Sequence, residues 1–259
     1  LQPRRRLGRH PRRRVLLLVA ALAGPVLVVG GPRPATADQP APLCVPGANP
    51  ITGLKTTEKV VTFTFDDGPS PTYTRPIMDA FEARGMRATF FLVTGSVRNR
   101  PELAREMAER GHELGNHSRT HHYSSAINVK EMPIAQGHIE EATGVRPQFF
   151  RMPGLAWGRK VVTATGVNGL CAIDTNFIVG DWRAPRAPAA TLCARFKRHL
   201  KPGSLVVLHD GGRGHGPTVT AVPCMLDYAI AQGYQVLGLS DFLALAGTAQ
   251  ATLTYRKVK

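Results

Sequence analysis

Short apolar runs alternate with longer mixed segments from about residue 59 onward. The apolar runs are rich in β-branched and aromatic residues, which is typical of buried strands. Seven strands are expected, at residues 59–65, 88–93, 113–117, 149–152, 170–174, 204–209 and 234–239. The segments between them predict helices at residues 72–84, 101–110, 129–143, 188–200 and 218–232. This alternation predicts an α/β fold with parallel strands, arranged either as a barrel or as an open sheet.

Polar residues of the types used in catalysis stand at or beyond the ends of these strands. In order along the chain they are Asp66, Asp67, His117, Arg151, Asp181 and His209. The carboxyl ends of parallel strands meet on one face of a barrel or open sheet. We therefore expect these side chains to converge there.

The first 37 residues have the pattern of a secretory signal peptide. Residues 1–14 contain seven arginines and no acidic residue, residues 15–30 are apolar, and Ala35-Thr36-Ala37 supplies small residues for cleavage. The alternative is an uncleaved membrane anchor, but this 16-residue apolar run is shorter than the roughly 20 residues of a spanning helix. We predict cleavage after Ala37, no stable membrane insertion, and a secreted or cell-wall-associated protein.

Cleavage there changes the net charge. The leader holds eight of the 33 lysines and arginines and none of the 18 acidic residues, so the charge falls from +15 to +7. This surplus fits an anionic surrounding such as a bacterial wall, and it requires no nucleic acid partner. A soluble surface with additional arginines explains it equally well.

The mature part is expected to contain one folded domain. Residues 38–58 are rich in Pro, Gly and Thr and predict an irregular lead-in, residues 59–245 form the domain, and residues 246–259 form a tail. We expect a monomer.

The four cysteines all lie in the mature part. An even number in an exported chain predicts two disulfides, with three possible pairings. We favour Cys193–Cys224, because both residues lie near the starts of neighbouring predicted helices. Cys44–Cys171 follows by elimination.

Two adjacent carboxylates end the first strand, in Thr64-Phe65-Asp66-Asp67-Gly68-Pro69. Such a pair repels unless a cation or a proton lies between the two groups. Successive side chains point in different directions, so one carboxylate can bind a metal while the other faces a substrate. The alternative is a simple turn, for which Asp-Gly-Pro is suitable.

A second pair, His117 and His121, can present two imidazoles to one ion. Chance spacing among nine histidines is the alternative. With Asp67 these residues form a two-histidine, one-carboxylate set, which is the composition of an open, catalytic zinc site. Zn²⁺ is favoured over Co²⁺ or Ni²⁺ by availability and geometry.

His209 follows a buried strand and has the chemistry to protonate a departing amine. A strand-end histidine with a local capping role is the alternative. Asp181 can supply the carboxylate that keeps this imidazole charged, and Arg151 can pair with a carboxylate of the site.

These segments resemble the five motifs of the polysaccharide deacetylases, carbohydrate esterase family 4. They occur in the family's order between about residues 59 and 243: TFDDGP at 64–69, HSRTH at 117–121, RMPG at 151–154, DW at 181–182 and VLH at 207–209. The resemblance implies a distorted (β/α) barrel with about seven strands, and it makes residues 59–245 a catalytic domain.

The resemblance also implies roles for individual residues. It makes Asp66 the general base, oriented by Arg151, and it makes His209 the general acid, tuned by Asp181. The metal ligands would be Asp67, His117 and His121. The backbone N–H of Gly154 would bind the oxyanion, and Trp182 would contact the substrate.

The third motif departs from the family pattern, which usually has an aromatic residue after the proline. Gly154 and Leu155 stand there instead, so the backbone donor is kept and an aromatic wall of the pocket is lost. The fifth motif has Val207 where leucine is usual, a conservative change in a strand.

The function implied is metal-dependent removal of N-acetyl groups from glycans that contain N-acetylglucosamine, such as peptidoglycan or chitin-type oligosaccharides. An acetylxylan O-deacetylase is the alternative with the same site. A non-catalytic wall-glycan-binding module is the alternative from another class, although binding alone does not require Asp66 or His209.

Overall fold

A computed structural model describes residues 44–183 and 187–258 of the chain. The predicted signal peptide at residues 1–37 lies outside the described residues. Among the described residues, no helix has the length and apolar character needed to cross a membrane.

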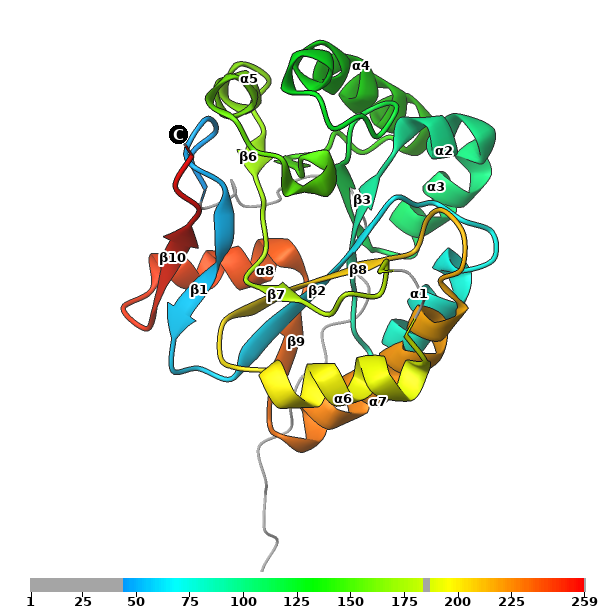
Figure 1. Cartoon of the computed structure of the whole chain (residues 1–259), viewed down its shortest axis with the longest axis vertical. Coiled ribbons are helices and arrows are strands. Elements are labelled where there is room, and N and C mark those ends of the chain that lie inside the picture. Colours follow the sequence, from blue (N-terminus) through cyan, green and yellow to red (C-terminus); the bar gives the residue numbers. More distant parts are fainter. Residues whose placement is uncertain (1–43, 184–186, 259) are drawn as a thin grey trace, which may run out of the picture. The chain divides into compact units, whose positions relative to one another are not determined.

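Eight parallel strands form the main sheet within the described residues, one more than the seven that the sequence predicts. Seven of them follow the order β6-β5-β4-β3-β2-β8-β7, while β9 pairs with the first residues of β2 (Figure 1). Their bounds are β2 Val60–Asp66, β3 Thr89–Leu92, β4 Glu113–Asn116, β5 Phe149–Phe150, β6 Cys171–Ala172, β7 Phe177–Ile178, β8 Ser204–His209 and β9 Gln235–Leu237. The additional strand is β7, whose two residues are too few to produce a periodic pattern.

The central strand β2 is buried along its whole length, but its two faces differ. Phe63 and Phe65 point toward the helices, where Phe63 packs against Phe81 and Phe196 with ring centroids 5.7 and 5.2 Å apart. Successive side chains of a strand point to opposite faces. Thr64 and Asp66 therefore face the interior of the curved sheet, and the functional groups begin on that side.

Helices connect the strands and most of them cover the outside of the sheet, whereas the last one packs against inward residues such as Val60 and Phe91. The helices are α1 Thr74–Glu82, α2 Thr94–Asn99, α3 Pro101–Glu109, α4 Ser125–Thr143, α5 Arg159–Val167, α6 Ala189–His199, α7 Gly216–Ala231 and α8 Leu239–Ala244. Helices α1, α3, α4, α6 and α7 share one apolar cluster with the outward residues of the strands. The helices α2, α5 and α8 were not predicted, and α2 and α8 have six residues each, which is too short for a clear periodicity.

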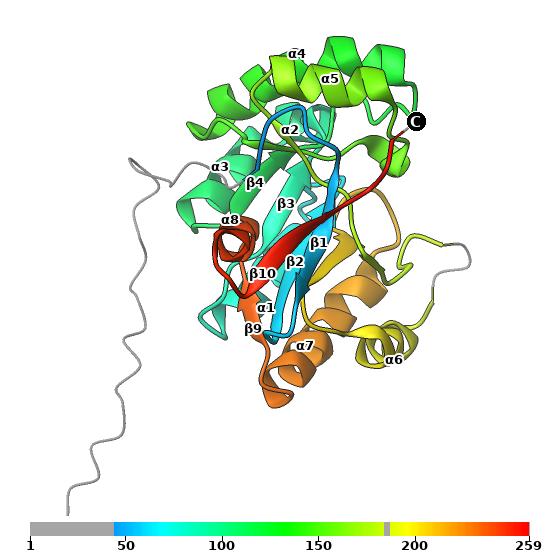
Figure 2. The same cartoon turned by 90° about the vertical axis from the view of Figure 1, so that its left-hand side faces the viewer.

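The lead-in and the tail each contain a strand that the sequence analysis did not anticipate. Strand β1 (Ile51–Thr56) pairs antiparallel with β10 (Ala251–Tyr255), and Figure 2 shows the two strands side by side. Each carries only a few apolar residues, and the partners are about 200 residues apart in sequence, so no local pattern marks them. Ile51 also forms a bridge with Ile173, which lies just after the edge strand β6.

Both predicted disulfides are confirmed. Cys193 of α6 is bonded to Cys224 of α7, and Cys44 is bonded to Cys171 of β6. The second bond closes a separation of 127 residues and fixes the described N-terminal segment to the edge of the sheet. No free cysteine remains among the described residues.

Candidate metal centre and active site

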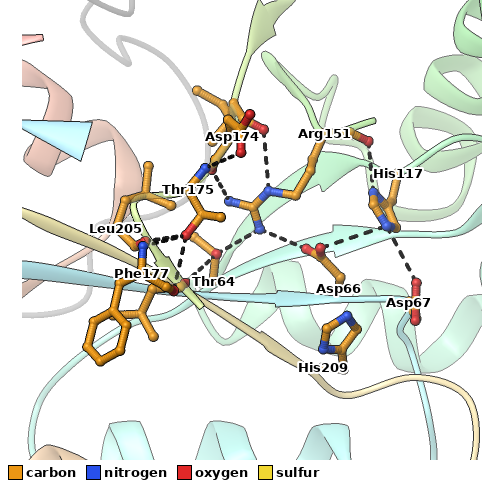
Figure 3. Close-up of polar contacts among 12 residues, drawn as sticks. Thr64, Asp66, Asp67, His117, Arg151, Asp174, Thr175, Phe177, Leu205 and His209 are labelled. Atoms are coloured by element: carbon orange, nitrogen blue, oxygen red, sulfur yellow. Dashed lines mark hydrogen bonds and ion pairs between the residues drawn. The ribbon is translucent and has the colours of Figure 1, made fainter. Parts of the chain in front are cut away.

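The parallel sheet brings the strand-end residues to one face. Asp66 at the end of β2 is the register partner of His209 at the end of β8. His117 directly follows β4, and its N–H donates to the Leu92 carbonyl at the end of β3 at 2.9 Å. Figure 3 shows Asp66, Asp67, His117 and His209 grouped beside the Arg151 side chain.

Asp67, His117 and His121 place their ligand atoms in one small cluster. Nε2 of His121 lies 3.1 Å from Oδ1 of Asp67, and Nε2 of His117 lies 3.5 Å from the same oxygen. Zinc bonds of about 2.0–2.1 Å to nitrogen and oxygen place the corners of a tetrahedron about 3.3 Å apart. The three side chains therefore fit a single divalent cation.

The hydrogen bonding of these side chains supports the same fit. Oδ1 of Asp67 is buried and has no hydrogen-bond partner among the described residues. Nδ1 of His117 lies 2.8 Å from the Arg151 carbonyl oxygen. A carbonyl can only accept, so Nδ1 carries the proton and Nε2 keeps its lone pair toward Asp67. This arrangement is the usual one for a histidine that binds a metal.

The backbone around the cluster is locally strained. Asp67, Ser118, His121 and Leu155 have φ values of 77°, 71°, 57° and 55°, and they are the described non-glycine residues with positive φ. The first three lie in the two loops that carry the candidate ligands. Such conformations cost on the order of 1–3 kcal/mol each and concentrate at functional sites.

Arg151 is fully buried and fixes the carboxylate of Asp66. Its Nη1 donates to Oδ1 of Asp66 at 2.8 Å and to the Thr64 hydroxyl at 2.7 Å. The other nitrogens donate to the backbone carbonyls of Ile173 and Asp174. A charged guanidinium with all of these partners holds the Asp66 carboxylate in one orientation.

His209 is held by Asp181. Nδ1 of His209 donates to Oδ1 of Asp181 at 2.9 Å, and the His209 backbone N–H donates to Oδ2 at 2.8 Å. Burial opposes a charge on His209, but the bond and ion pair with Asp181 outweigh it and raise its pKa from 6.5 to about 9. The imidazole is therefore protonated at neutral pH and can act as an acid.

Comparisons with known proteins agree with this geometry. The family model for polysaccharide deacetylase matches residues 53–173. A peptidoglycan-N-acetylglucosamine deacetylase of Bacillus cereus is 31% identical over 191 residues, which cover 72% of this chain and 89% of the relative. The chain belongs to the polysaccharide deacetylase family.

Two further similarities show the range of this family. A chitooligosaccharide deacetylase of Sinorhizobium fredii is 31% identical over 158 residues, covering 58% of this chain and 72% of the relative. The crystal structure of a family pseudoenzyme from Bacillus anthracis superposes with a TM-score of 0.69 at 25% identity, covering 75% of this chain and 68% of that one. Since the family includes pseudoenzymes, catalysis has to be judged from the residues present.

An aromatic side chain that the sequence analysis did not single out lies beside Gly154. The sequence predicts that the aromatic wall after Pro153 is lost, but the ring of Tyr123 lies against Gly154. A Cβ atom on Gly154 would come within 2.6 Å of that ring. Tyr123 is 62% exposed and packs edge-on against His121, with centroids 5.3 Å apart. Tyr123 lies outside the five motifs, so no motif marks it.

Trp182 is the second aromatic residue at the site. It is partly exposed, and its ring centroid lies 5.2 Å from that of His209. Tyr123 and Trp182 thus stand beside His121 and His209, respectively, with part of each ring accessible to a ligand.

Asp210 is a further buried carboxyl group that the sequence analysis did not single out. It accepts a hydrogen bond from the Thr74 hydroxyl, and a Cβ atom on Gly68 would meet its Oδ2 at 2.3 Å. Burial, reinforced by the charges of Asp67 and Asp66, raises its pKa to about 7. Asp210 therefore supports the turn at Gly68, directly after Asp67.

Proposed function

We propose that the protein is a metal-dependent hydrolase that removes N-acetyl groups from N-acetylglucosamine-containing glycans outside the cell. The observation that carries this proposal is the position of Asp66. Its carboxylate is fixed by Arg151, and its Oδ2 lies 3.8 Å from Nε2 of the candidate ligand His117. Metal binding alone would not require this second, separately held carboxylate.

The metal would be held by Asp67, His117 and His121, with Zn²⁺ as the first candidate and Co²⁺ as an alternative. A divalent cation at this place polarises a carbonyl oxygen and lowers the pKa of a bound water toward about 7.

Asp66 would accept the proton of the attacking water. Its bond to Arg151 through Oδ1 fixes the orientation of the carboxylate, and Oδ2, which lies toward His117, would receive the proton. The backbone N–H of Gly154 would donate to the oxygen that becomes negative as the water attacks.

His209 would then give a proton to the nitrogen of the breaking amide bond. The amine leaves as a neutral group, and acetate is the other product. Asp181 would hold the imidazole in its charged form before this transfer and fix its orientation.

Tyr123 and Trp182 would hold the sugar ring. The C–H groups on one face of a pyranose pack well against an aromatic ring, and both rings are accessible beside the reacting groups. Tyr123 would thereby replace the aromatic residue that usually follows the proline of the third motif.

The names of the relatives favour an N-acetylated glycan as substrate, since they act on peptidoglycan N-acetylglucosamine and on chitooligosaccharides. A bifunctional xylanase/deacetylase is also similar, at 28% identity, but this chain covers only 31% of it. Acetylxylan is therefore included as a test substrate.

The test is acetate release from three substrates: a peptidoglycan fragment, a chitooligosaccharide and acetylxylan. Each is measured with the zinc-loaded protein and again after chelation. We expect zinc-dependent release from the two N-acetylated glycans. Preferential release from acetylxylan would support the O-deacetylase, and glycan binding without any release would support a non-catalytic module.

A further inference from the structure

A separate hollow of about 580 Å³ lies between α2, α3 and α4. Its volume is within the range of about 300–1,000 Å³ that is typical of small-molecule sites. Most of the charged or ionisable side chains that line it are basic, namely Arg98, Arg105, Arg119 and His138. Among the described residues there, the single carboxylate is that of Glu141.

Within the described residues the side chains of Arg98, Arg105 and Arg119 have no partner, so their guanidinium groups are available to a ligand, as are those of some other surface arginines. Arg75, Arg84 and Arg110 each form an ion pair with a carboxylate at 2.7–2.8 Å. The guanidinium groups of the hollow form no hydrogen bond or ion pair within residues 44–183 and 187–258. Planar guanidinium groups pair best with carboxylate or phosphate oxygens.

His138 lines the hollow as a fourth ionisable group, but its buried ring nitrogen does not face it. Its Nδ1 atom is buried and has no hydrogen-bond partner among the residues that the structure describes. The arginines are therefore the side chains on which ligand binding in the hollow would depend.

The hollow borders the loop that carries the candidate metal ligands. Arg119 stands two residues from both His117 and His121, a separation that a chain spans in at most about 7 Å. The loop is also fixed to α2, because the N–H of Gly95 donates to the Arg119 carbonyl at 3.1 Å. Arg119 therefore places one edge of the hollow near the candidate metal centre.

We propose that this hollow binds an oxyanion, either carboxylate or phosphate, carried by the same polymer whose N-acetylated sugar is at the metal centre. The proposal rests on the proposed function and refines its substrate. An anionic wall glycan would be bound at two places, whereas a neutral chitooligosaccharide would be bound only at the metal centre and its aromatic residues.

The test compares the double variant Arg98→Gln/Arg105→Gln with the matched control Arg159→Gln/Arg198→Gln. Both remove two positive charges from exposed arginines, and only the first pair lines the hollow. Three substrates of equal length are used: a chitooligosaccharide, a peptidoglycan glycan fragment with free carboxylates, and the same fragment with its carboxylates converted to methylamides.

For the hollow variant we expect KM for the free-carboxylate fragment to rise about tenfold, since two charge-assisted contacts are lost in a partly exposed site. The kcat, and the KM for both uncharged substrates, should stay within about twofold of the wild type. The control should show no substrate-selective change. Thermal unfolding of each variant checks that its fold is intact.

A glycerol-phosphate oligomer, added as a competitor, distinguishes the source of the oxyanion. If the hollow binds phosphate, this oligomer inhibits the wild type and the control but not the hollow variant. The KM values for the free-carboxylate fragment and its methylamide form are then equal. Identical behaviour of the hollow variant and the control in all arms would overturn the proposal.

The same ligands are also titrated by calorimetry. If the wild type releases no acetate from any glycan, the proposed function fails. Weaker binding of the free-carboxylate fragment or of the oligomer by the hollow variant alone would still establish the anion site, and equal binding by all proteins would refute it.

Discussion

His209 and Asp181 form a two-point contact in which one carboxylate accepts both the ring Nδ1–H and the backbone N–H of the same histidine. Thr218 donates to the same carboxylate at 2.9 Å. The contact therefore sets both the charge and the position of the imidazole, and the two effects can be separated by experiment.

The variant Asp181→Asn tests the charge. The pKa of His209 is raised to about 9 in the protein, so a general acid at this position is lost as the pH rises through that value. Without the Asp181 charge, burial dominates and the pKa falls. We expect the basic limb of kcat/KM to shift to lower pH by at least about one unit, which is a loss of at least about twofold at pH 8 and about tenfold at pH 10.

The measurement is kcat/KM from about pH 5 to 10 for both proteins, loaded with the same metal. A cation at Asp67 repels the charged imidazole and lowers the pKa of His209 in both proteins. The difference in this pKa between the two proteins is therefore the informative quantity. Thr218→Val, which removes only one donor to Asp181, is the matched control. An unchanged basic limb in Asp181→Asn would show that His209 is not the acid.

Substitutions of the neighbouring carboxylates Asp66 and Asp67 are expected to have different effects on metal binding and on turnover. Loss of a residue that only hydrogen-bonds to a metal ligand lowers metal affinity roughly 10–100-fold. Asp67→Asn removes a proposed ligand itself and should lower the affinity by more than this. Asp66→Asn should keep its metal and lose about 10²–10⁴ in kcat, as expected when a general base is removed.

Metal content by elemental analysis, together with kcat, distinguishes these two variants. Asp241→Asn, an exposed aspartate on α8, controls for the loss of a charge. Near-native activity in Asp66→Asn, or full metal content in Asp67→Asn, would reverse the assignments.

Tyr123 should contribute to glycan binding through its ring. Tyr123→Ala is expected to raise the KM for an N-acetylated oligosaccharide about fivefold, equivalent to about 1 kcal/mol, while Tyr123→Phe changes it little. Hydrolysis of a small aryl acetate, which has no sugar ring, should be the same in both variants. Tyr255→Ala removes a similarly exposed tyrosine on β10 and serves as the control. A parallel loss on the aryl acetate would indicate a structural role through His121 instead.

His112 should make stability depend on pH, far from the metal centre. Its Nδ1 accepts the Ala88 N–H and its Nε2–H donates to Glu82, so the neutral ring is the form that fits. Burial lowers its pKa from 6.5 to about 4. The unfolded chain binds this proton first, so stability is full above about pH 6.5 and declines toward pH 4, by about 3 kcal/mol in total.

The free energy of unfolding in urea, measured at about pH 7 and about pH 5, gives this decline. Both pH values lie above the range in which Glu82 titrates. His112→Asn can keep the bond from Ala88 but cannot take up the second proton, so its stability should change less between these values. His199→Gln replaces an exposed histidine and should behave as the wild type does. Equal slopes for His112→Asn and the wild type would contradict the prediction.

The sequence predicts best what is encoded locally. All seven predicted strands of the main sheet are present, because runs such as residues 60–65 are buried on both faces and stay apolar or β-branched throughout. The grouping of Asp66, His117 and His209 also follows from the sequence, since parallel strands end on one face.

What the sequence does not predict depends on distant partners. Thr52 and Thr254 are hydrogen-bonded at 2.8 Å although 202 positions separate them, and nothing near either residue indicates the pairing. The contact of Tyr123 with Gly154 is similar, because it depends on how two loops meet. The carbonyls of Ile173 and Asp174 that hold Arg151 have no sequence signature, since every residue has a carbonyl.

The contacts of the Arg151 guanidinium link the loss of activity to unfolding of the barrel. The guanidinium joins β2 to the segment after β6 through side-chain and main-chain contacts, and it lies 4.1 Å above the Phe91 ring centroid. The group that orients the proposed base thus also fastens the inside of the barrel. Catalytic competence should therefore vanish in the same cooperative step as tertiary structure when urea is added, which would make turnover a direct reporter of the intact barrel.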